Sequence, residues 1–204
     1  MNDTTFPDYT ALYAQASAQA GYFTTTQARA HGVSWRALAH HAARGRFWRL
    51  RRGLYRFRDY PSSPHEEVVA AWLAIGVERS VVSHDTALDL YDLTDLIPSS
   101  VHLIVPRAQR GLHPPQGVTL HTTTHPLGDD EVTIREGMRL TTPERTLLDL
   151  AEADTTLEHV ERGIQAAVAR GWLDVTHLQR AAKERGPRVA RVVAAALDAE
   201  ERSA

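Results

Sequence analysis

The sequence predicts an α+β protein built from two modules, and three observations support this prediction. Helical periodicity with capping residues runs through residue 44 and is followed by a short segment in which aromatic and branched residues mix with arginine. A stretch rich in proline and serine at residues 61–64 indicates a linker. Beyond it, helical and strand-like segments are mixed within a chain of 204 residues, long enough for two small domains. We therefore expect one domain over residues 1–60 and a second over residues 61–204.

Three helices are predicted in the first module. Residues 8–19 have apolar positions at helical spacing, with Asp8 as a possible N-cap. The threonines at residues 24–26 offer caps for a short second helix, which Gly32 ends. A third helix begins directly after Ser34, its predicted N-cap. Two helices joined by a tight turn that contains glycine are typical of a helix-turn-helix.

A basic hairpin follows the third helix. Residues 46–58 carry arginine on both sides of Gly53, and a glycine near the tip suits the positive φ of hairpin turns. Its expected apolar side consists of Phe47, Leu50, Leu54 and Tyr55. The order of three helices and a basic hairpin predicts a winged helix-turn-helix. In this fold the third helix enters the major groove and the wing lies along the backbone or minor groove.

Charge separates the two modules. No aspartate or glutamate occurs from Tyr9 to Phe57, a span that holds eight arginines. Beyond Arg58, 14 basic residues face 23 acidic ones, which leaves a net charge of −9. A basic block in an otherwise acidic chain indicates contact with nucleic acid, because each neutralised phosphate releases counterions. We therefore expect double-stranded DNA as a partner of the first module.

Particular side chains are expected to touch that DNA. Arg36, His40 and Arg44 recur every four residues on the third helix, so they share one face and are candidates for contacts with bases or phosphates. The full candidate set on the third helix and the hairpin is Ser34, Arg36, His40, His41, Arg44, Arg46, Arg49, Arg51, Arg52, Arg56 and Arg58. Hairpin arginines are better suited to phosphates than to bases. Trp35 and Trp48 could stack on nucleotides, but the apolar residues beside them favour a core role, and Tyr55 is also expected in the core.

The second module is predicted to combine several helices with a small mixed sheet. Strand character marks residues 100–107, 117–123 and 131–136. Helices are expected at residues 64–75, 83–92, 143–153, 157–170, 175–183 and 188–201.

No catalytic residue, metal site or cofactor is predicted in this module. The eleven histidines have no metal-binding spacing, and His84, Asp85 and Asp89 are explained by an ordinary capped helix. A helix start with a matched surface arginine explains Glu144, Arg145, Asp149 and Glu152. If this segment has a role, we expect it to organise the domain through an Arg145 ion pair or through hydrogen bonds to the neighbouring sheet.

Composition excludes several other classes. The absence of cysteine removes disulfides and thiol chemistry and agrees with a reducing compartment. No apolar run is long enough to span a membrane, and the first residues lack the basic and apolar regions of a signal peptide. We therefore expect a cytoplasmic protein.

Several motifs together resemble the AbiEi-type antitoxins and transcriptional regulators of bacterial type IV toxin–antitoxin systems. They are G-Y-F-T-T-T-Q-A at 21–28, H-G-V-S at 31–34, R-R-G-L-Y-R at 51–56, S-H-D-T-A-L at 83–88 and T-T-P-E-R-T-L-L-D-L-A at 141–151. This resemblance implies a winged helix that represses its own operon at inverted repeats, with residues 34–44 as the reading helix and 46–58 as the wing. It also implies an antitoxin domain that counters a nucleotidyltransferase-like toxin without a stable complex. Longer relatives continue into an endonuclease-like domain, for which this sequence has no room.

Two alternatives stay open at this point. One is a nuclease or nucleotidyltransferase-like enzyme that a winged helix delivers to DNA. It would need clustered carboxylates near a lysine, and the single lysine, Lys183, lies far along the chain from them. The other is a regulator whose acidic module senses a small ligand or mediates dimerisation. For the leading interpretation we expect a monomer or a weak dimer.

Overall fold

The computed structural model describes residues 6–123, 125–153 and 156–201. Two compact units divide the chain: residues 1–78 with 136–138, and residues 79–135 with 139–204. The predicted DNA-binding segment, residues 1–60, falls within the first unit, which also includes the helix that follows it. The predicted boundary at residue 60 stays a prediction.

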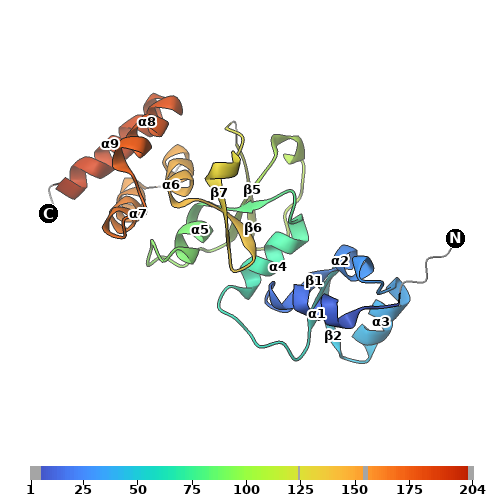
Figure 1. The fold of residues 1–204 in the computed structure, drawn as a ribbon. Helices are drawn as coiled ribbons and strands as arrows, with labels where there is room; N and C mark the ends of the chain where they lie inside the picture. The colour runs from blue at the N-terminus through green and yellow to red at the C-terminus, as the bar shows by residue number, and fades with distance from the viewer. Residues whose placement is uncertain (1–5, 124, 154–155, 202–204) are drawn as a thin grey trace. The chain divides into compact units, whose positions relative to one another are not determined.

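The first unit has the predicted order of helices and hairpin (Figure 1). Its elements are α1 (Tyr9–Ser17), β1 (Tyr22–Thr24), α2 (Thr25–Ala30), α3 (Trp35–Ala43), β2 (Phe47–Arg51), β3 (Leu54–Phe57) and α4 (Glu66–Ile75). The winged helix-turn-helix is therefore confirmed as the N-terminal fold. Strand β1 was not predicted, because three residues are too few to show an alternating pattern.

Local hydrogen bonds fix where the helices begin. The Asp8 side chain accepts from the Ala11 amide of α1, and Thr24 forms a reciprocal capping box with Gln27 of α2. Gly32 adopts φ +74° in the turn between α2 and α3, a conformation that glycine takes without a steric penalty. These helix boundaries are thus set by polar and glycine residues within a few positions of each end.

The three strands form an antiparallel sheet in the order β1-β3-β2. The pairing of β2 with β3 is interrupted between Arg49 and Arg51, where one extra residue breaks the register. That residue is Leu50, which is 44 % exposed, so the expectation that it lies on the apolar side of the hairpin is wrong. A bulge of this kind redirects a side chain relative to a regular ladder.

An aromatic cluster joins the sheet to the helices. Phe23 of β1 lies 5.0 Å from Phe47, 5.8 Å from Tyr55 and 5.2 Å from Phe57, measured between ring centroids. Leu12 of α1, Ala28 of α2 and Val33 and Leu38 around α3 complete this buried core. Aromatic pairs at these separations stabilise a core beyond the burial of their area. The helix-turn-helix therefore sits on a rigid base.

The second unit contains a mixed sheet in the order β6-β5-β4-β8-β7 with helices around it. Strand β4 pairs antiparallel with β5 and parallel with β8, and β5 pairs parallel with β6. The strands are β4 (Val81–Val82), β5 (Val101–Val105), β6 (Val118–Thr122), β7 (Val132–Arg135) and β8 (Met138–Thr141). The helices are α5 (His84–Leu90), α6 (Pro143–Glu152), α7 (Leu157–Ala169), α8 (Val175–Glu184) and α9 (Pro187–Glu201), with 3-10 turns at Arg107–Gln109 and Asp129–Glu131.

The predicted α+β fold class is confirmed by these two units. Strands β4 and β8 were not predicted because they are short and lie directly against helices α5 and α6 in the sequence. In the described part of the chain, no helix is long and apolar enough to cross a membrane.

Candidate nucleic-acid interface

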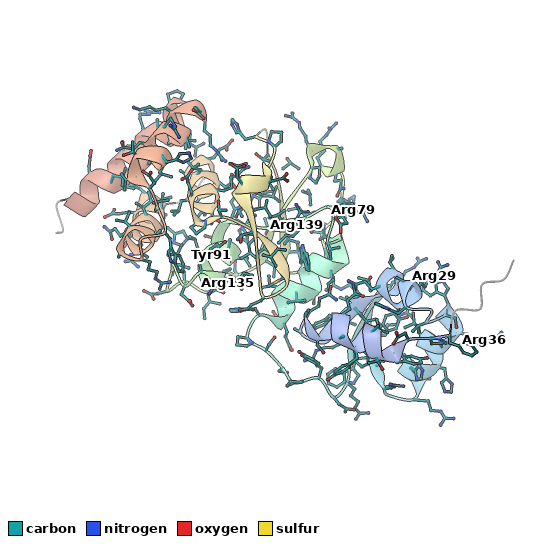
Figure 2. The ribbon with its side chains drawn as sticks, viewed as in Figure 1. Arg29, Arg36, Arg79, Tyr91, Arg135 and Arg139 are labelled. Carbon is teal, nitrogen blue, oxygen red and sulfur yellow. The ribbon has the colours of Figure 1, made fainter. Side chains whose placement is uncertain are left out.

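Helix α3 presents the predicted basic stripe to solvent. Arg36, His40 and Arg44 are all exposed, while Leu38 on the opposite side is fully buried. Ser34 uses its hydroxyl to accept a hydrogen bond from the Ala37 amide at 3.2 Å, which fixes the start of the helix. Figure 2 shows Arg36 extending outward from this unit. The geometry leaves the stripe available for a partner, and its contacts with DNA stay a prediction.

The wing carries the second group of candidate arginines. Arg49, Arg52 and Arg58 are exposed, and Arg51 is half-buried. Among the described residues, these four side chains have no ion-pair partner, in keeping with a segment that contains no carboxylate. Their charge is therefore not neutralised within the unit.

Arg46 and His41 are held against aromatic rings. The guanidinium carbon of Arg46 lies 4.9 Å from the centroid of the Tyr9 ring, although the side chain as a whole is exposed. His41 shares a 2.8 Å hydrogen bond with the Tyr9 hydroxyl and packs on Phe47. Burial lowers the pKa of His41, and the nearby Arg46 and His40 lower it further. These effects favour the neutral form of His41, whose ring packs at the base of α3.

Arg56 does not belong to the exposed set, and its inclusion as a DNA contact is wrong. Arg56 is only 3 % exposed, and its guanidinium group forms an ion pair with Glu66 of α4 at 2.9 Å. It also donates to the carbonyl oxygens of Ala20 and Pro61. The reason is topological: β3 is the central strand, and α4 packs on β1 and β3, so a side chain on that face is covered.

Both tryptophans of the module are exposed, against the expectation that they belong to the core. Trp35 is 58 % exposed at the first position of α3, and Trp48 is 50 % exposed on the edge strand β2. Tyr55, in contrast, is 4 % exposed, and its predicted core role is confirmed. Tryptophan on an edge strand or a helix start has no second layer to cover it, which hydrophobicity alone does not reveal.

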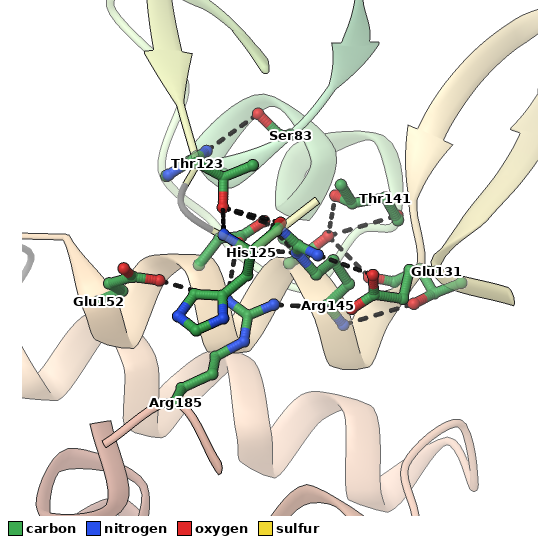
Figure 3. A network of polar contacts seen from close by, with 12 residues as sticks. Ser83, Thr123, His125, Glu131, Thr141, Arg145, Glu152 and Arg185 are labelled. Carbon is green, nitrogen blue, oxygen red and sulfur yellow. Dashed lines mark hydrogen bonds and ion pairs between the residues drawn. The ribbon is translucent and has the colours of Figure 1, made fainter. Parts of the chain in front are cut away.

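In the second unit, Arg145 organises a buried polar network (Figure 3). Arg145 is 1 % exposed. Its Nε donates to both carboxylate oxygens of Asp149, and one terminal nitrogen donates to Glu131 at 2.8 Å. The other terminal nitrogen donates to Thr123 Oγ1 and to the carbonyl oxygen of His125. The expected ion pair and hydrogen bonds of Arg145 are confirmed, whereas its interpretation as a surface arginine is wrong.

A second arginine closes this network. Arg185, just after α8, donates to Asp149 at 2.7 Å and lies 3.4 Å from Glu152. Burial opposes the charged form of Arg145, but the carboxylates of Asp149 and Glu131 outweigh it and raise the pKa of the guanidinium. These carboxylates therefore serve as partners of buried arginines, which links α6, α8 and the segment before β7.

Three histidines from different elements stack beside that network. His84 and His121 are stacked with ring centroids 3.7 Å apart, and His121 Nε2 lies 3.0 Å from His102 Nδ1. His84 adopts φ +51°, a backbone conformation that non-glycine residues rarely take. Asp85 lies 3.8 Å from His102 and forms a 2.7 Å hydrogen bond with His159. The spacing of these residues along the chain does not predict the cluster, because it depends on the parallel pairing of β5 with β6.

Within the described residues, no group of three or more histidine, aspartate or glutamate side chains has a geometry that could hold a metal ion. Stacking and mutual hydrogen bonds occupy the histidine rings instead.

We predict that Arg56→Ala reduces stability and spares intrinsic DNA affinity. Removal of the guanidinium group leaves Glu66 and two carbonyl oxygens without their donor. The free energy of unfolding should fall by roughly 2 to 3 kcal/mol, which is less than for a fully buried ion pair because Glu66 is partly exposed. Urea unfolding of the variant measures the loss. Arg52→Ala is the matched control and should leave the unfolding free energy within about 0.5 kcal/mol. A variant as stable as the control would contradict the structural role.

We also predict that the second unit loses stability in mild acid. Burial, reinforced by the neighbouring histidines, lowers the pKa of His84 to about 2 and that of His121 to about 4. The unfolded chain takes up protons below about 6.5 while the folded protein does not, so stability falls as pH drops from 6.5 toward 4. Each histidine should contribute about 1 to 2 kcal/mol of this loss between pH 7 and 5. His121→Phe keeps a stacked ring and should reduce the loss in urea unfolding; equal pH dependence in both proteins would refute the assignment.

Comparison with known proteins adds a family and a structural neighbour to this geometry. Residues 12–58 match the model of a family described as transcriptional regulator, AbiEi antitoxin. A solved structure, that of the RV2827C protein from Mycobacterium tuberculosis, is similar with a TM-score of 0.61 and 15 % sequence identity, over 97 % of this chain and 80 % of that one. At this identity the likeness concerns the fold alone. No curated protein matches the sequence.

The family match covers α1 from Leu12 onward, both helices of the helix-turn-helix and the wing, and these are the elements that expose the unpaired arginines. The resemblance to the AbiEi antitoxin family of transcriptional regulators is thus confirmed over residues 12–58.

Proposed function

We propose that this protein is a DNA-binding repressor that acts on its own promoter at inverted repeats. The observation that carries the proposal is a set of arginines on α3 and the wing that are exposed, except for the half-buried Arg51, and that have no ion-pair partner among the described residues. Arg36 lies on α3, and Arg44 is the C-cap of that helix, which would enter the major groove, where an arginine can bind guanine through two hydrogen bonds. Arg49, Arg51, Arg52 and Arg58 lie on the wing, where they would bind phosphates.

We further propose that the chain is the antitoxin of a type IV system. In this proposal the second unit counters a nucleotidyltransferase-like toxin without forming a stable complex, and the protein is cytoplasmic and either monomeric or weakly dimeric. The family match supports a regulator and antitoxin role in general terms. A non-enzymatic role agrees with the chemistry of the second unit, since Asp149 and Glu131 are paired with buried arginines.

A second candidate function is favoured by one cavity in the second unit. It has a volume of about 530 Å³, enough for a small molecule, and its walls include Arg145, Arg185, Trp172 and His177. A ligand bound there would touch the network that links α6 and α8. Under this alternative, the second unit would sense a small ligand and regulate the DNA-binding unit.

Binding to a fragment of its own promoter provides the first test. Affinity should fall steeply with salt, because each phosphate contact releases counterions. The double variant Arg36→Ala, Arg44→Ala should lose its sequence preference, because each arginine that reads a base contributes about 1 to 3 kcal/mol of discrimination against the wrong base. Arg51→Ala with Arg52→Ala should weaken binding to all sequences and reduce the salt slope by about 1 for each phosphate that is no longer neutralised. Mobility-shift titrations at several salt concentrations measure these effects.

The matched control for that experiment is Arg180→Ala. Arg180 is an exposed arginine of α8, so its removal changes the net charge without touching the first unit. A flat salt response of the unmodified protein would refute the arginine model. Identical behaviour of the two double variants would refute the division between a reading helix and a phosphate-binding wing.

Co-expression with the neighbouring gene tests the antitoxin role. If that gene encodes a toxic nucleotidyltransferase-like protein, the full chain should restore growth, and the Arg36→Ala, Arg44→Ala variant should also restore it when both genes are expressed from foreign promoters. The variant separates toxin neutralisation from repression, because it alters only the proposed reading helix. Growth arrest that persists with the full chain would leave regulation as the sole function.

A further inference from the structure

A cavity of about 630 Å³ lies between the start of α2, the start of α3 and the tip of the wing. It is lined by Thr24, Thr25, Thr26, Arg29, Ala30, Trp35, Arg52 and Gly53. Apart from Arg52, none of these residues was expected to contact DNA. The cavity lies between the wing and α2, the helix that precedes the reading helix. None of its lining residues belongs to the stripe of Arg36, His40 and Arg44 on α3.

The wall between α2 and the wing is rigidly built. The Thr25 amide donates to the carbonyl oxygen of Gly53 at 2.9 Å, which fastens the wing tip to the first turn of α2. Gly53 adopts φ +85°, so the tip depends on glycine. Thr25 is 7 % exposed, and its hydroxyl is one of two buried side-chain polar atoms in the described part of the chain that have no hydrogen-bond partner. An unsatisfied buried hydroxyl is costly, so this wall offers an unused polar group.

The chemistry of the lining selects an anion. Arg29 and Arg52 are exposed, and neither has an ion-pair partner among the described residues. The lining contains three hydroxyl groups and two guanidinium groups but no carboxylate. A guanidinium group matches the paired oxygens of a phosphate, with charge-assisted hydrogen bonds that are stronger than neutral ones. The exposed ring of Trp35 adds a flat apolar surface beside these charges.

We propose that this cavity binds one phosphodiester group of the DNA backbone, with Arg29 and Arg52 on the phosphate oxygens and Trp35 against the adjacent deoxyribose. This inference rests on the proposed DNA binding and adds to it a specific phosphate site. Because the site connects α2, α3 and the wing tip, one bound phosphate fixes the angle at which α3 approaches the groove. It also explains why Trp35 stays exposed at the start of α3.

The test pairs protein variants with single neutral phosphates in the promoter fragment. Methylphosphonate is substituted at one backbone position at a time, and affinity is measured by mobility shift for the unmodified chain and for Arg29→Ala. We expect one position in each half-site at which methylphosphonate weakens binding by the unmodified protein about tenfold and weakens binding by Arg29→Ala by a smaller factor, because only Arg52 then remains on that phosphate. Trp35→Ala should lose affinity at all salt concentrations, whereas Arg29→Ala should also reduce the salt slope by about 1.

Controls distinguish a local contact from a loss of folding or of general charge. Arg29 is exposed, so Arg29→Ala should unfold in urea like the unmodified chain, and Arg180→Ala should keep the full methylphosphonate penalty. Arg29→Lys retains the charge and should recover part of the affinity. If the unmodified chain binds DNA but every methylphosphonate costs the same with and without Arg29, the phosphate site is refuted while the proposed function stands. If the unmodified chain does not bind its promoter, the proposed function fails and the site fails with it.

Discussion

The first unit depends on the burial of both faces of the central strand β3. On one face Tyr55 and Phe57 pack with Phe23 in the aromatic cluster that carries the helices. On the other face Arg56 is covered and paired with Glu66 of α4. A strand fixed on both sides holds β2 and the wing tip in a defined place. The orientation of the exposed arginines follows from this packing, because the wing and α3 share the same core.

The second unit is organised in a different way, around buried charge. Arg145 and Arg185 together contact Asp149 and Glu131, and these contacts join helices α6 and α8 to the sheet region. Such networks are demanding, since the loss of one partner leaves an uncompensated charge in a low dielectric. The segment from Thr141 to Leu150 is therefore explained by structure: Thr142 caps α6, and Arg145 and Asp149 hold its neighbours. The carboxylate of Asp149 is paired with Arg145 and Arg185, and that of Glu144 with His177.

The parts of the fold that could be predicted from the sequence are those with local signals. Ser34, Gly32 and the Thr24–Gln27 pair mark the helix-turn-helix, because caps and glycine turns act within a few residues. Strands β1, β4 and β8 could not be predicted from the sequence. They contain only two to four residues, which show no periodicity, and they pair with strands from distant segments of the chain. The histidine stack could not be predicted for the same reason, since residues 84, 102 and 121 meet only through strand pairing.

The sequence by itself determined that a cationic, acid-free module precedes an acidic one, and that the first carries two helices, a turn and a basic hairpin. These properties follow from composition and short-range hydrogen bonding. Only the tertiary structure decided which arginines meet solvent. Arg52 and Arg56 lie four residues apart in the same basic run, yet one is exposed beside Trp35 and the other is sealed under α4. Burial is set by elements that arrive from elsewhere in the chain, and no local pattern encodes which face they cover.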